Sequence, residues 1–80
     1  MKKYDYSVTI CNQPDEILFE KQCAAIEKIP HVKKAKLLED VDGSKHQYYN
    51  HPKGEISVVN DFYVGCLYVD SDFDLSPYFA

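Results

Sequence analysis

The sequence predicts an α+β domain in which one helix packs on a mostly antiparallel sheet of four to five strands. Residues 4–10 alternate strictly between apolar and polar side chains, as a half-buried strand does. Residues 14–29 carry apolar side chains at helical spacing and precede Pro30, which disfavours helical geometry in the residue before it. Asp42-Gly43 is a strong signal for a two-residue hairpin turn between strands. Together these features indicate the element order β-α-β-β-β, with one further strand if the last β-like segment folds back on itself.

The first strand and the helix each have one apolar face. The helix is expected to begin at Asn12 or Gln13, either of which can cap the first turn, with Pro14 at a position that tolerates proline. We expect the apolar face of the strand to be buried: Tyr4, Tyr6, Val8 and Ile10. We expect one arc of the helix to face the sheet: Leu18, Phe19, Cys23, Ala25, Ile26 and Ile29.

The rest of the chain reads as strands separated by turns. Residues 32–41 and 44–49 flank the predicted Asp42-Gly43 turn, and residues 55–69 form the longest β-like stretch. That stretch is predicted to be a hairpin that turns at Asn60-Asp61, or alternatively one bent strand with a bulge. The β-α-β start followed by more strands resembles part of a ferredoxin-like layout, although the second helix of that fold is not visible in the sequence.

The chain of 80 residues has room for a single domain, residues 1–80, in which residues 70–80 form an acidic and aromatic tail. No apolar run approaches the roughly 18 residues that a membrane-spanning helix needs, so no membrane is expected as a partner. The N-terminal residues carry no apolar stretch typical of a secretory signal. With the odd number of three cysteines, this favours free thiols in the cytoplasm.

Charge is distributed unevenly along the chain. The net charge is −4, and all nine bases are lysines. Because arginine dominates base readout and bidentate phosphate binding, direct nucleic-acid binding is not expected. Residues 55–80 contain five acids, no base and six of the eleven aromatic residues. Aromatic side chains among carboxylates are suited to a partner protein with a basic surface.

No catalytic or metal-binding signature connects the cysteines, histidines and carboxylates. The sequence contains no GxSxG, HExxH, phosphate-binding glycine loop or CxxC pair. We therefore expect no enzyme activity, no catalytic residue, no cofactor and no metal site.

The function that the sequence favours is that of a small acidic protein-binding module. Such a protein would act as an inhibitor, or as an immunity or anti-defence protein, by presenting carboxylates to a basic partner that itself binds nucleic acid. The residues expected to bind the partner lie in the acidic and aromatic third of the chain: Asp61, Tyr63, Tyr68, Asp70, Asp72, Phe73 and Asp74.

Two other classes of function stay open. The first is a homodimeric ligand-sensing or assembly domain, with the aromatic tail as the dimer contact and a small pocket lined by His46, His51 and Tyr49. The second, weaker alternative is an enzyme that uses a thiol or histidine, with Cys11 or Cys66 as the reactive thiol and Cys66 beside His46.

Overall fold

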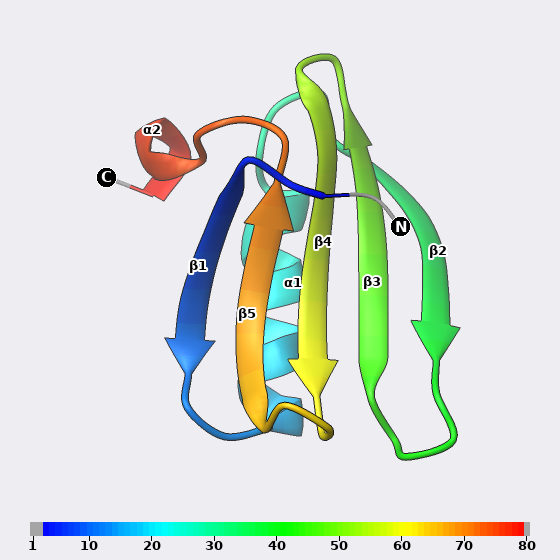
Figure 1. The fold of residues 1–80 in the computed structure, drawn as a ribbon. Helices are drawn as coiled ribbons and strands as arrows, with labels where there is room; N and C mark the ends of the chain where they lie inside the picture. Colours follow the sequence, from blue (N-terminus) through cyan, green and yellow to red (C-terminus); the bar gives the residue numbers. More distant parts are fainter. Residues whose placement is uncertain (1–2, 80) are drawn as a thin grey trace.

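A computed structural model, which describes residues 3–79, shows one antiparallel sheet of five strands with a helix across one face (Figure 1). The predicted α+β class is confirmed. Met1, Lys2 and Ala80, which belong to the predicted domain and tail, lie outside the described residues. Neither described helix is long and apolar enough to cross a bilayer. The strands are β1 (Tyr6–Cys11), β2 (Lys33–Glu39), β3 (Lys45–His51), β4 (Gly54–Asp61) and β5 (Cys66–Ser71), and the helices are α1 (Glu16–Glu27) and α2 (Ser76–Phe79).

The strand order in the sheet is β1-β5-β4-β3-β2, and every neighbouring pair is antiparallel. β1 and β2 therefore form the two opposite edges, and α1 crosses the sheet between them (Figure 1). The first β-α-β unit does not join neighbouring strands. β3, β4 and β5 fill the space between its two strands as consecutive hairpins.

The core lies between α1 and the three central strands. The buried side chains of α1 and of the turn after it are Phe19, Ile26 and Ile29. Alternate residues of β3, β4 and β5 face them, because successive strand side chains point to opposite faces. These are Tyr49, Ile56, Val58, Leu67 and Val69. The opposite face of the sheet, which we call the open face, has no helix over it (Figure 1).

The first strand contributes less to the core than its alternating pattern predicts. Tyr6, Val8 and Ile10 are 45%, 58% and 40% exposed, so the expectation of a buried apolar face is wrong for this strand. The physical reason is the sheet order, which places β1 at an edge while α1 packs over β4. Tyr4 precedes the strand, and its hydroxyl donates to the carboxylate of Glu55.

Two predicted boundaries are also wrong. The N-cap of α1 is Asp15, whose Oδ1 accepts a hydrogen bond from the backbone N of Leu18 at 3.0 Å. The backbone N of Asp15 in turn donates to Oδ1 of the buried Asn60 at 3.0 Å. Asn60 therefore stays within β4, and the predicted hairpin turns at Phe62–Gly65 instead. The cap residue Asp15 is thus held by a contact with Asn60 of β4, which lies far from it in the sequence.

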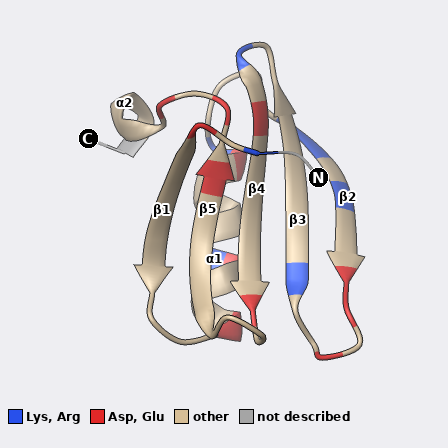
Figure 2. Cartoon of the chain, in the orientation of Figure 1, with Lys and Arg blue, Asp and Glu red and all other residues tan. Residues whose placement is uncertain are grey.

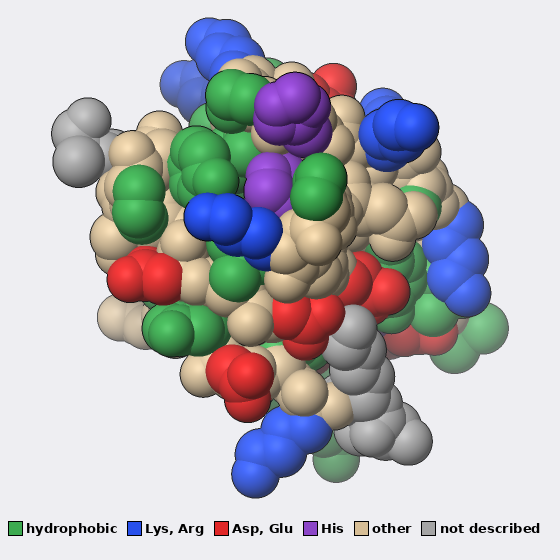
Figure 3. Space-filling view, turned by 90° about the horizontal axis from the view of Figure 1, so that it is seen from above, with side chains coloured by type: hydrophobic (Ala, Val, Ile, Leu, Met, Phe, Trp, Pro, Cys, Tyr) green, Lys and Arg blue, Asp and Glu red, His purple; other side chains and the backbone are tan. Residues whose placement is uncertain are grey.

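The C-terminal tail packs on its own domain. Phe73 stacks on His51 with ring centroids 4.7 Å apart, and Tyr78 meets both rings edge-on. Leu75 also packs against the core. Figure 3 looks onto this end of the molecule and shows histidine side chains among hydrophobic ones. The aromatic side chains at positions 73 and 78 therefore have partners within the monomer.

Candidate protein-binding surface at the turn end

Two turns lie side by side at one end of the sheet. The first connects β2 to β3, and the second connects β4 to β5. The backbone N of Phe62 in the second turn donates to Oγ of Ser44 in the first at 2.8 Å. Ser44 is buried, so the two turns form one continuous surface. We call residues 40–44 and 61–65 the turn-end surface.

Large apolar side chains on this surface face solvent. Phe62, Tyr63 and Val64 are consecutive in the chain and are 50%, 91% and 67% exposed. Val41 on the neighbouring turn is fully exposed. Single exposed apolar residues are ordinary on a protein surface, whereas a run of three on one turn beside a fourth makes this surface a candidate site of interaction.

Hydrogen bonds fix the backbone beneath these side chains. Oδ1 of Asp61 accepts from the backbone N of Tyr63 at 2.8 Å and from that of Val64 at 3.0 Å. The backbone N of Gly65 donates to the carbonyl of Asp61 at 3.0 Å, and Gly65 has a φ of 83°, which favours glycine. These hydrogen bonds therefore hold the turn in one backbone conformation, with its apolar side chains exposed.

Carboxylates surround the exposed apolar side chains. Asp40 and Asp42 lie in the first turn and Asp61 begins the second (Figure 2). Oδ1 of Asp42 accepts from the backbone N of Ser44 at 2.9 Å, and this bond lowers the pKa of the Asp42 carboxyl. The nearby base Lys45 is paired with Glu16 of α1. The surface thus combines exposed apolar side chains with three carboxylates and carries no unpaired base among its described residues.

Three of the seven residues predicted to bind a partner lie on or beside this surface. Asp61 and Tyr63 belong to it. The hydroxyl of Tyr68 on β5 lies 3.5 Å from Oδ2 of Asp61. Burial of the ring, with the charges of Asp61 and Asp70 beside it, raises the pKa of Tyr68 to about 12. Asp70 is on the same face of β5 as Tyr68, but it pairs with Ser57 one residue before the far end of the strand, so it lies away from the turn-end surface.

The other three lie at the opposite end of the sheet. Oδ2 of Asp72 accepts from the backbone N of Glu55 at 2.8 Å. Oδ1 of Asp74 accepts from the backbone N of Ser76 at 2.9 Å and from its hydroxyl at 2.7 Å, and these bonds lower the pKa of Asp74. Phe73 is stacked on His51. Because β5 ends at Ser71, the strand alternation that would align Asp70 with Asp72 and Asp74 on one face does not continue past Ser71.

The residues of the two alternative functions do not converge. Tyr49 points to the core and its hydroxyl donates to Glu27 at 2.7 Å, whereas His46 lies 3.7 Å from Asp40 and His51 stacks on Phe73. The thiol and imidazole proposed to act together are also apart, because β4 separates Cys66 from His46 in the sheet.

Within residues 3–79, no group of three or more metal-ligating side chains gathers. Three described cysteines are free and partly buried, and burial raises the pKa of Cys23. Comparison of the chain with protein-family models, with curated proteins and with solved structures gave no match. The partial ferredoxin-like layout accordingly stays a prediction.

Sequence reasoning missed three residues of the turn-end surface, namely Val41, Phe62 and Val64. The signal for two of them is present in the chain, where three apolar residues stand between Asp61 and Gly65. Aspartate and glycine at that spacing are typical turn residues. A strand interpretation of residues 62–69 concealed the turn, because Phe62, Val64, Cys66 and Tyr68 also alternate.

Proposed function

We propose that this chain is a small, non-enzymatic protein-binding module, and that its turn-end surface enters an apolar cleft bordered by basic residues on a partner protein. The observation that carries the proposal is an ordered turn with three consecutive apolar side chains facing solvent. While these side chains face solvent they add little to the stability of the fold. A partner that covers them would bury apolar surface, and the entropic cost would be low because the turn is already ordered.

The charges around the turn select the kind of partner. Asp40, Asp42 and Asp61 border the apolar centre, and Lys45 is already paired with Glu16. A partner that surrounds its cleft with lysine or arginine would gain attraction at the rim and faster association. A partner with an acidic border would be repelled, which gives the surface specificity as well as affinity.

This chemistry supports the narrower proposal of an inhibitor, including an immunity or anti-defence protein. A basic cleft that normally holds phosphates of a nucleic acid offers the same charges to carboxylates. The free cysteines support a reducing compartment, the cytoplasm, as the place of action.

The first experiment maps the contact. The photo-crosslinking amino acid p-benzoylphenylalanine replaces Tyr63 in one variant and Lys53, on the turn at the opposite end of the sheet, in a second. Both are expressed in the host and irradiated. We expect a crosslinked protein with a basic surface from position 63 and none from position 53. A partner captured equally from both positions would contradict the proposed contact.

The second experiment measures the affinity of the purified partner by calorimetry. The double variant Tyr63→Ser, Val64→Ser should bind at least about tenfold more weakly, which is a loss of about 1.4 kcal/mol. Leu38→Ser, which removes an exposed apolar residue from β2, is the matched control and should bind as the wild type does. Binding should also weaken as salt is raised. Equal affinity of the double variant would refute the proposed surface, and salt-independent binding would refute the basic border.

A further inference from the structure

The outer edge of β1 lacks two features that protect a strand edge, charged residues and proline, while its pairing with β5 shifts register between Thr9 and Cys11. β1 ends the sheet, and its residues Tyr6–Ile10 are all exposed. It contains no charged residue and no proline. The opposite edge, β2, carries Lys33, Lys34 and Lys36, which are typical of a protected edge (Figure 2). An exposed edge without such residues presents unpaired backbone groups to another strand.

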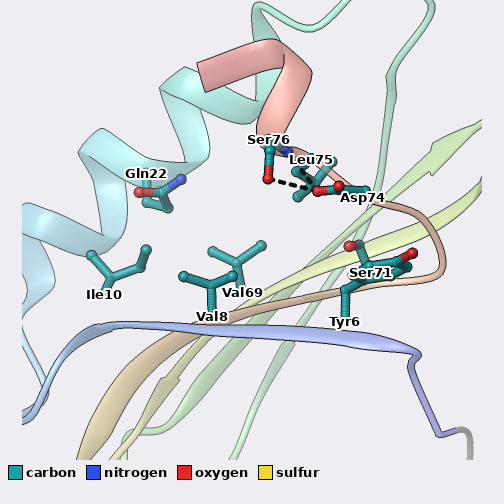
Figure 4. Close-up of a pocket in the computed structure, with 9 residues that line it drawn as sticks. All are labelled: Tyr6, Val8, Ile10, Gln22, Val69, Ser71, Asp74, Leu75 and Ser76. Atoms are coloured by element: carbon teal, nitrogen blue, oxygen red, sulfur yellow. Dashed lines mark hydrogen bonds between the residues drawn. The ribbon is translucent and has the colours of Figure 1, made fainter. Parts of the chain in front are cut away.

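The same strand borders an apolar groove. A cavity of about 420 Å³ lies between β1, α1 and the segment that leads into α2. Figure 4 shows Val8 and Ile10 projecting from β1 on the side of Gln22 of α1, and Tyr6 beside Ser71 at the other end of the groove. These three side chains are exposed because α1 does not extend over the edge strand. A strand added to β1 would continue the sheet and bring its own apolar side chains over this groove.

We propose that a second copy of the chain adds that strand, with β1 pairing antiparallel with β1 of the second copy about a two-fold axis at Val8. In the sequence Tyr6-Ser7-Val8-Thr9-Ile10, Val8 has a small hydroxyl residue on each side and then a large apolar residue on each side, so the pattern is symmetric about Val8. The axis places Val8 opposite Val8, Tyr6 opposite Ile10, and Ser7 opposite Thr9 of the second copy. All apolar pairs then lie on the helix side and all hydroxyl pairs on the open face, so the strand is complementary to itself.

Charge favours this pairing over the alternatives at the edges. Two uncharged β1 strands bring no like charges together, whereas two β2 strands would bring together six lysines. The exposed parts of Tyr6, Val8 and Ile10, with the edge backbone and the groove rim, would bury on the order of 1,000 Å² in total, near the low end for specific interfaces. An area of this size is typical of weak contacts, so we expect a dimer that dissociates on dilution.

Sedimentation velocity over a concentration series tests the pairing. The wild type should change from monomer to dimer between roughly 1 μM and 1 mM. Val8→Lys places two ammonium groups against each other at the axis and should remain monomeric at concentrations where the wild type is dimeric, as should Val8→Glu. Mixing the two variants in equal amounts should restore a dimer, because the axis then pairs lysine with glutamate.

Two controls separate this dimer from other associations. Leu37→Lys makes the same change at an exposed apolar residue of β2 and should dimerise as the wild type does. The variant Tyr63→Ser, Val64→Ser should also dimerise normally, which keeps this inference independent of the turn-end surface. Circular dichroism establishes that each variant is folded. A wild type that stays monomeric at 1 mM, a dimeric Val8→Lys, or a mixture that stays monomeric would each overturn the proposed pairing.

Discussion

Replacing Gly54 with alanine adds one methyl group at a position where the chain has no room for it. Gly54 begins β4 with a φ of 144°, a conformation that side chains with a Cβ rarely adopt. A Cβ at this position would lie 2.4 Å from Cβ of Asp72 and 2.9 Å from its Oδ2. That carboxylate oxygen accepts a hydrogen bond from the backbone N of Glu55 at 2.8 Å. The new methyl group must therefore displace a contact that ties the start of β4 to the end of β5.

The expected loss of stability has two parts. Backbone strain contributes about 1–3 kcal/mol, and overlap with Asp72 contributes about 1–3 kcal/mol more. Gly54→Ala should thus lower the free energy of unfolding by about 2–6 kcal/mol. A domain of this size has only about 4–12 kcal/mol in total, so the variant should lose a large fraction of its stability.

Equilibrium unfolding in urea, followed by circular dichroism, measures this loss. Gly65→Ala is the matched control, since Gly65 also has a positive φ, of 83°, but a Cβ added there would meet nothing within 4 Å. It should lose only the strain energy, about 1–2 kcal/mol. If Gly54→Ala loses no more than Gly65→Ala, the close approach of Asp72 does not constrain the fold and the reasoning fails.

Two further predictions concern the helix cap and the alkaline limit of stability. Asp15→Ala removes the acceptor for the backbone N of Leu18 and should lower the free energy of unfolding by about 1 kcal/mol, which lowers the thermal midpoint by about 4–8 °C. Asp15→Asn keeps an acceptor oxygen and should lose less stability. Equal losses in the two variants would contradict the cap. The pKa of Tyr68 is raised to about 12, above its unfolded value of about 10, so its contribution to stability is present below pH 10 and disappears as the pH rises through about 12. Urea unfolding of Tyr68→Phe should therefore show a shallower alkaline decline than the wild type, and an identical slope would refute this.

The sequence pattern predicted correctly those elements that depend on interactions between residues close together in the chain. The helix formed where apolar residues recur at helical spacing, and its buried residues Phe19, Ile26 and Ile29 lie in the predicted arc. The predicted hairpin formed at Asp42-Gly43 between two antiparallel strands, with a φ of 92° at Gly43. Its loop has three residues rather than the predicted two, because the backbone of Asp40 bonds to that of Ser44 and encloses Val41 as well. These features depend on residues close in sequence, so the chain alone specifies them.

The candidate site was predicted only in part, because exposure depends on distant elements. Tyr63 and Phe73 are both aromatic residues near aspartates, yet the first faces solvent and the second stacks on His51 from another strand. Asp70 and Asp72 are two residues apart, but β5 ends between them, and the carboxylate of Asp72 is held by the backbone of Glu55. No spacing in the sequence carries that information.

The sequence by itself determined the α+β class, the periodic faces of the elements, the hairpins and the segregation of acids into residues 55–80. The tertiary structure decided that β1 is an edge, that Asp15 caps the helix against Asn60, and that Phe62, Tyr63 and Val64 form an exposed turn. The physical reason is that periodicity states which side of an element is apolar, whereas strand pairing and helix position decide what covers that side. At β1 and at the turn end, no described residue of this chain covers the apolar side chains completely, and it is there that we expect other molecules to bind.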